Sequence, residues 1–109
     1  MIDFSKQITA QMKAQAANAA LRGQFEKATQ AFMDGKAQAA GYDGLMTAIS
    51  YAEEPAVAKF QEEGKAFRAW RSNVWAYANE QLELVLSGQK TQPTLETFLD
   101  SLPVLELPA

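Results

Sequence analysis

The residues that could carry out acid–base or metal chemistry in this sequence are two pairs of neighbouring glutamates, Glu53-Glu54 and Glu62-Glu63. Paired carboxylates can transfer protons or bind a divalent cation. In helical bundles, however, the glutamates of a metal site usually come with a histidine three residues further on, and this chain contains neither His nor Cys. We therefore interpret the first pair as a helix cap and the second as part of a solvated helix face, and we expect no metal and no cofactor.

Nucleophilic catalysis is not indicated by the sequence either. Without a histidine, Ser5 or Ser50 would need a lysine as its base, and neither serine lies in a motif of that kind. The six glycines are not spaced like a dinucleotide fingerprint or a phosphate-binding loop. We therefore expect a protein that is not an enzyme and has no catalytic residues.

The densest group of distinctive side chains lies in residues 67–77, which contain both tryptophans, two arginines, one phenylalanine and one tyrosine. On a helix, Arg71 and Trp75 are four residues apart and could stack. Such side chains occur in hydrophobic cores edged by arginine stems, in protein interfaces and in sites for single-stranded nucleic acid. The sequence favours the core first, then a protein interface, because the glutamates on both sides of this segment oppose a nucleic acid.

The charge of the chain also argues against a nucleic-acid partner. The 109 residues include 10 basic and 13 acidic side chains, a net charge of −3, whereas proteins that neutralise many phosphates are usually basic. Residues 1–40 have a net charge of +2 and residues 41–109 of −5. No segment approaches the ~18 apolar residues of a membrane span, and no apolar signal segment follows Met1. We therefore expect a cytosolic protein that binds neither nucleic acid nor a membrane.

The periodicity of the sequence predicts an all-α protein. Residues 3–40 lack proline, are rich in good helix formers and predict one long helix. Residues 43–52 predict a short helix, and residues 55–87 predict a second long helix, packed antiparallel to the first and ended by Ser87-Gly88. A short C-terminal helix with Thr94 as its N-cap is then expected to precede an extended apolar tail that lies across the helices.

Gly64 is an unusual member of the apolar stripe of the second long helix. A glycine inside a helix costs about 1 kcal/mol relative to alanine, so its presence suggests a packing reason. We expect it to admit a neighbouring side chain or a close helix crossing. The other members of the stripe are Val57, Phe60, Phe67, Trp70, Val74, Tyr77 and Leu84.

The first long helix has two apolar stripes that do not form one straight seam. The first consists of Phe4, Ile8 and Met12, and the second consists of Leu21, Phe25, Ala28 and Phe32. Either the alanine-rich segment between them packs closely on another helix, or the first half of the helix leaves the domain and meets a different partner.

We accordingly divide the chain into two parts by sequence. Residues 1–40 form a long Ala/Gln-rich helix, a candidate arm for self-association, because such helices are marginal alone and need a packing partner. Residues 41–109 form a compact aromatic helical module. The candidate protein-interface residues are Leu21, Phe25, Phe32, Arg68, Arg71 and Trp75.

A family resemblance adds a biological setting. It rests on Gly41-Tyr42-Asp43, Ala48-x-Ser50-Tyr51-Ala52 and Phe60-x-x-Glu63-Gly64-x-Ala66-Phe67-x-x-Trp70-Arg71-x-x-Val74-Trp75-x-Tyr77, and on the closing Leu-Pro-x-Leu-x-Leu-Pro. This pattern, over about residues 38–107, resembles small proteins encoded in the tail or tail-fibre region of tailed bacteriophages and prophages. Family members often have Cys after the position of Tyr77, where this chain has Ala78.

The resemblance implies a virion structural component or a tail-fibre assembly factor, without catalytic residues. Its partner would be a tail or tail-fibre protein, met in the host bacterial cytoplasm or in the virion. Together with the composition, it leads us to expect a non-enzymatic protein that acts by protein–protein contacts and that self-associates through its N-terminal helix. The alternative is a small helical adaptor or regulator that binds a phage or host protein.

Overall fold

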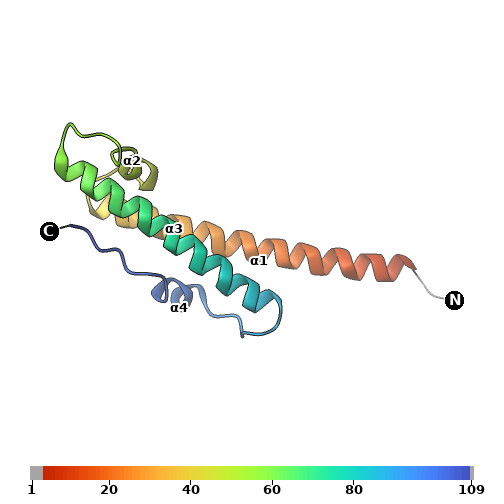
Figure 1. The fold of residues 1–109 in the computed structure, drawn as a ribbon. Helices are drawn as coiled ribbons and strands as arrows, with labels where there is room; N and C mark the ends of the chain where they lie inside the picture. Colours follow the sequence, from red (N-terminus) through yellow and green to blue (C-terminus); the bar gives the residue numbers. More distant parts are fainter. Residues whose placement is uncertain (1–3, 109) are drawn as a thin grey trace.

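The computed structural model describes residues 4–108, with side chains described from residue 10 onward, and shows an elongated helical protein measuring 72 × 22 × 18 Å (Figure 1). The helices are α1 (Phe4–Ala39), α2 (Leu45–Ser50), α3 (Ala58–Leu86) and α4 (Leu95–Asp100). Within the described residues there is no strand. Helices α1 and α3 run antiparallel, α2 joins them at one end, and α4 packs on α1. The predicted all-α fold of two long antiparallel helices and two short ones is confirmed.

Glycines in the left-handed backbone region end both long helices. Gly41 has φ 99° and Gly88 has φ 78°, values that favour glycine because a side chain would be strained there. After α1, the backbone N–H groups of Gly41 and Tyr42 donate to the carbonyls of Gln38 and Ala37. Gly88 and the residue after it repeat this pattern at the end of α3. The predicted stop at Ser87-Gly88 is therefore confirmed.

The core lies between α1, α2 and α3 and extends to α4. Its largest fully buried side chains are Phe67, Met33, Leu45 and Val74. Among the described residues Thr29 is the one buried polar residue, and its hydroxyl donates to the carbonyl of Phe25, 2.7 Å away, so it leaves no unpaired group in the core.

The predicted apolar stripe of α3 is only partly buried. Phe67, Trp70 and Val74 are buried, but Val57 and Phe60 at its start are exposed. Gly64 is buried, and a Cβ atom there would meet the backbone of Ala48 in α2 and of Ala52 just after it. The predicted close helix crossing is therefore confirmed.

The C-terminal segment follows the prediction closely. Thr94 caps α4, because its hydroxyl accepts a hydrogen bond from the backbone N–H of Thr97 at 3.1 Å. Phe98 of α4 packs edge-on against Phe25 of α1, with ring centroids 5.0 Å apart. Beyond α4 the extended tail lies against α3, where the indole N–H of Trp70 donates to the carbonyl of Pro103 at 2.7 Å.

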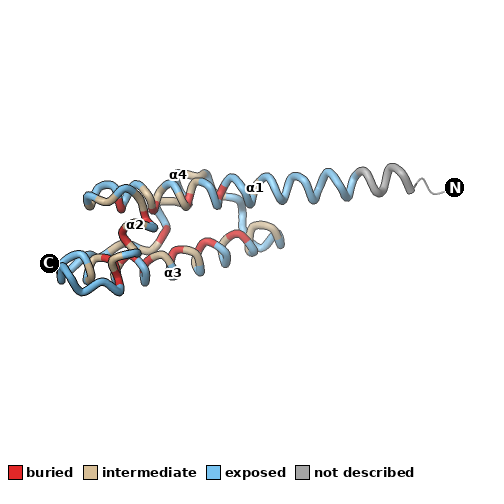
Figure 2. Tube along the Cα trace, turned by 90° about the horizontal axis from the view of Figure 1, so that it is seen from above, coloured by how far each residue is buried: buried red, intermediate tan, exposed pale blue. Residues whose placement is uncertain are grey.

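Helix α1 passes beyond the end of α3 and divides into a packed part and a projecting part. Every residue from 10 to 20 is exposed, whereas the contacts of α1 with the core begin at Leu21 (Figure 2). We call residues 4–20 the arm and residues 21–108 the body. By side-chain exposure the arm ends near residue 21, inside α1, whereas the division expected from the sequence follows the end of this helix near residue 40.

Helix α2 is capped by a residue of another helix. Its N-cap is Gly44, which has no side chain, and the carboxylate of Asp34 on α1 instead accepts a hydrogen bond from the backbone N–H of Leu45 at 2.9 Å. The side chain of Gln30 donates to the same carboxylate oxygen at 3.3 Å. Asp34 therefore fixes the start of α2 on α1, and its negative charge suits the positive end of the helix dipole.

We expect Asp34→Ala to lower the free energy of unfolding by about 1 kcal/mol, because the N–H of Leu45 loses its partner. Urea unfolding followed by circular dichroism measures the loss. Asp34→Asn is the matched control, since its amide oxygen can still accept the hydrogen bond, and it should retain most of the stability. Equal losses in the two variants would mean that charge, and not the cap, is what matters.

Candidate protein-interaction site

The aromatic and basic segment of α3 separates into a buried and an accessible side. Phe67, Trp70 and Val74 are buried, and the rings of Phe67 and Trp70 meet edge-on at 6.1 Å. Trp75 is half-buried and packs against the edge of the core, while Arg68 is exposed. Phe67, Trp70 and Val74 are therefore core residues. Arg68, Arg71 and Trp75 remain accessible.

The two arginines are held by contacts with α2 and the turn that follows it. The Nη1 atom of Arg68 lies 2.8 Å from Oε1 of Glu53, and this ion pair lowers the pKa of Glu53. The Nη1 atom of Arg71 lies 3.6 Å from Sδ of Met46. Arg71 thus reaches toward α2, and the structure does not record the stacking with Trp75 that the sequence analysis considered.

The three apolar interface candidates on α1 belong to the core of this chain. Phe25 is only 7% exposed, and Leu21 and Phe32 are half-buried against the same core. The ring centroid of Phe32 lies 6.2 Å from that of Trp70. The outer edges of Leu21 and Phe32 are accessible, whereas Phe25 is occupied by contacts inside the body.

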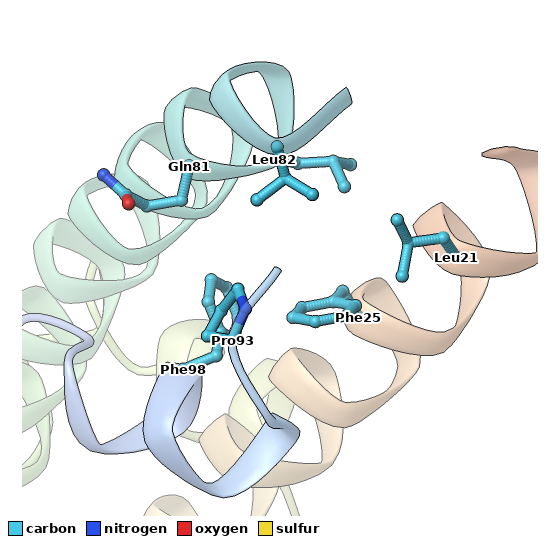
Figure 3. A pocket seen from close by; sticks show the side chains of 7 residues that line it. Leu21, Phe25, Gln81, Leu82, Pro93 and Phe98 are labelled. Carbon is cyan, nitrogen blue, oxygen red and sulfur yellow. The ribbon is translucent and has the colours of Figure 1, made fainter. Parts of the chain in front are cut away.

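A small apolar cavity lies where the arm leaves the body (Figure 3). Its free volume is about 10 Å³, enough for one water molecule but not for an organic ligand. Leucine and phenylalanine side chains from α1, α3 and α4 converge on it in the figure. The lining residues are Leu21, Phe25, Gln81, Leu82, Val85, Pro93 and Phe98.

A larger groove of about 310 Å³ follows the C-terminal tail. Phe32 and Trp70 form its floor on the core side, and the Nζ atom of Lys36 lies 5.4 Å from the centre of the Phe32 ring. On the tail itself Val104 is 82% exposed. The groove is thus open, half apolar and bordered by a segment that one hydrogen bond from Trp70 fixes to α3.

The glutamate pairs do not form a common site. Glu53 pairs with Arg68, while Glu54 accepts a hydrogen bond from the backbone N–H of Ala56 at 2.9 Å. Glu62 pairs with Lys65 on the same helix, and Glu63 accepts a hydrogen bond from the hydroxyl of Tyr42 at 3.0 Å. Among the described residues no three acidic side chains are placed to hold a metal ion.

The hydrogen bond between Tyr42 and Glu63 joins the loop after α1 to α3. Burial, and then the bond to the Glu63 carboxylate, raise the pKa of Tyr42 from 10.0 to about 12. The fold therefore favours the neutral phenol. The stability that this bond contributes is fully present below about pH 10, the value for the unfolded chain, and is lost as the pH rises through about 12.

We expect the wild-type chain to lose more stability between about pH 10 and pH 12 than the Tyr42→Phe variant, which has no group to ionise at this site. Urea midpoints at both pH values measure the difference. As a second readout, Tyr42→Phe should remove the last part of the rise in tyrosinate absorbance, near a pH of about 12. Parallel pH profiles for the two proteins would contradict the assignment.

The arm contains the longest run of exposed residues in the part of the chain whose side chains are described. All side chains from Ala10 to Ala20 are exposed, and Met12 is 63% exposed. Phe4 and Ile8, which the sequence analysis placed on the same stripe, lie outside the described side chains. The six interface candidates omitted Met12, although its place on that stripe was the signal that could have identified it.

The remaining findings concern membranes and relatives. In the part of the chain that the structure describes, no helix combines the length and the apolar character needed to cross a membrane. No family model, curated protein or solved structure matches this chain.

Proposed function

We propose that this chain is a non-enzymatic structural component or assembly factor of a bacteriophage tail. It acts by contacts with other proteins, one of them a tail or tail-fibre protein, in the host bacterial cytoplasm or in the virion. The phage setting comes from the sequence resemblance, and the contact function comes from the shape of the molecule.

The observation that carries the proposal is the exposed arm. Residues 10–20 are exposed throughout, so this part of α1 lacks the tertiary packing that supplies most of the stability of helices in proteins. A partner that covers the arm would stabilise it, whereas a protein acting alone would gain nothing from it. The arm is therefore best understood as a surface for another chain.

The residues on which the resemblance rests have structural roles in the body. Tyr42 is bonded to Glu63, Gly64 lies under α2, and Phe67 and Trp70 fill the core beside them. These residues hold α2 on α3, so proteins that share the pattern are expected to share the body. None of these contacts implies a reaction, which agrees with a role in assembly.

Mass spectrometry of purified phage particles, beside pull-down of the tagged full chain from an infected-cell lysate, tests the proposal. Presence in the particle would identify a structural component. Absence from the particle, together with capture of a tail or tail-fibre protein from the lysate, would identify an assembly factor. Absence from the particle with capture of a host regulator instead would overturn the proposal in favour of the adaptor.

A further inference from the structure

The prolines of the C-terminal tail keep it extended. Pro103 and Pro108 enclose the four residues from Val104 to Leu107. Proline has a fixed φ and no backbone N–H, and it disfavours the helical conformation in the residue before it. Helix α4 accordingly ends at Asp100, and residues 103–108 lie in neither a helix nor a strand. The tail therefore meets the body as an extended segment.

Three contacts hold this segment on the body. Leu102, just before it, is 5% exposed and belongs to the core. The indole N–H of Trp70 donates to the carbonyl of Pro103 at 2.7 Å, and Leu105 packs half-buried against the same core. The body thus accepts a leucine followed by a proline, the carbonyl oxygen of that proline, and a second leucine two residues later.

The surface that receives the segment is the groove of about 310 Å³ that borders the tail. Phe32 of α1 and Trp70 of α3 line it, with ring centroids 6.2 Å apart. Aromatic-lined grooves recognise extended proline-containing segments, which lose little conformational freedom on binding because they are extended already. The indole N–H adds a directed donor to the apolar floor. The groove therefore has the two features of a site for a peptide of this kind.

The tail is held weakly in this groove. Among the hydrogen bonds between described residues, the one with Trp70 is the only one that involves residues 103–108. Val104 is 82% exposed and Leu107 is 37% exposed. Open grooves of about 310 and 250 Å³ border Pro103 and Val104. Segments with few buried apolar contacts and free backbone groups open locally at low cost, so the tail can leave the groove while the body stays folded.

We propose that this groove binds an extended segment of a partner protein with the same Leu-Pro-x-Leu chemistry, and that the tail is an intramolecular ligand which the partner displaces. The tail then acts as a strap, and the apparent affinity for the partner is proportional to the fraction of molecules in which the strap is open. This contact surface is separate from the arm. It rests on the proposed function only in taking this chain to act by contacts with other proteins.

Hydrogen exchange of the Trp70 indole N–H in the wild-type chain tests the release of the tail. The Trp75→Phe variant assigns its NMR signal, since the chain has only these two tryptophans. We expect exchange through a local opening that low concentrations of urea hardly affect, whereas the backbone N–H of Val74 in the core should exchange only on global unfolding. If both groups depend on urea in the same way, the tail does not leave the folded body and the proposal is overturned.

A synthetic peptide with the sequence of residues 101–108, added to the full chain, tests the binding. Leu105→Asp should weaken the strap and let the peptide bind about tenfold more tightly than to the wild type, because a charge replaces a half-buried leucine. Val104→Asp is the matched control, since it places the same charge on the preceding, exposed residue, and it should change the affinity by less than about twofold. Bound peptide should return the Trp70 indole signal of Leu105→Asp to its wild-type position, and a peptide that carries the Leu105→Asp change itself should not bind.

The remaining outcomes separate this proposal from its alternatives. No binding of the peptide to Leu105→Asp, or equal binding to both variants, would overturn it. If sedimentation showed dimers of the full chain that Leu105→Asp abolishes, the ligand would be the tail of a second copy, and displacement by a separate partner would be wrong. Loss of the groove would leave the arm, and with it the proposed function, standing. Absence from phage particles with capture of a host regulator would instead overturn the proposed function and leave the groove standing.

Discussion

Replacing Gly64 with alanine should lower the free energy of unfolding by about 2 kcal/mol. A Cβ atom at this position would lie 2.7 Å from the carbonyl oxygen of Ala48 and 2.7 Å from the backbone nitrogen of Ala52. Both are backbone atoms, so no side chain can turn away and α2 must move off α3. Because two backbone atoms must be displaced, we expect a cost near the upper end of the usual range for overpacking, about 3 kcal/mol, of which the better helix propensity of alanine recovers about 1 kcal/mol.

Gly35→Ala provides the matched control for this prediction. Gly35 also lies inside a long helix, but a Cβ atom there would have no neighbour within 4 Å. The change should therefore leave the protein as stable as before or stabilise it by up to about 1 kcal/mol. Urea unfolding followed by circular dichroism compares the two variants. If Gly64→Ala is as stable as Gly35→Ala, the contact between α2 and α3 is looser than these distances imply.

The close contact between α2 and α3 at Gly64 also affects the accessible residues of α3. Met46 on α2 and Glu53 in the turn after it hold Arg71 and Arg68. A shift of α2 would release both arginines, so Gly64→Ala should also change the surface that these side chains form. This coupling explains why a glycine is useful at a position where alanine would make a better helix.

Local signals in the sequence predicted the end of α3 and the start of α4 well. The helix cap expected at Glu53-Glu54 was wrong, because α3 begins at Ala58 with Val57 as its N-cap and no side-chain cap. Ser87-Gly88 and the Thr94 cap depend on residues within one turn of the helix end, so their chemistry can be recognised without the rest of the fold. The close packing at Gly64 could also be predicted. A glycine weakens the helix that contains it, so its place on an apolar stripe suggests that a neighbouring element packs closely there. These features fixed the order and the approximate lengths of the four helices.

Contacts between distant residues could not be predicted in the same way. From the sequence, Leu21, Phe25 and Phe32 could belong either to an interface or to the core. Phe25 is buried because α4 folds back onto α1 and places Phe98 against it. The cap of α2 by Asp34 has no signal in the sequence, because the two residues it joins are eleven positions apart. The same holds for the boundary of the arm, which depends on where the far end of α3 meets α1.

Phe67→Ala should have the largest effect, a loss of about 3–5 kcal/mol in the free energy of unfolding. The side chain is fully buried, with its ring centroid 5.9 Å from that of Tyr42. A domain of this size is stable by only about 5–15 kcal/mol, so the loss is a large part of the total and the urea midpoint of the variant should fall accordingly.

Phe60→Ala separates burial from the mere loss of an aromatic ring. Phe60 lies two turns earlier on α3 and is 38% exposed, although its ring is also near Tyr42, at 6.3 Å. Its removal should cost about 1 kcal/mol, because the site is open and water can fill it. Urea midpoints of the two variants give the comparison. Similar losses would mean that Phe60 is covered in solution, and sedimentation would then show whether a second copy covers it.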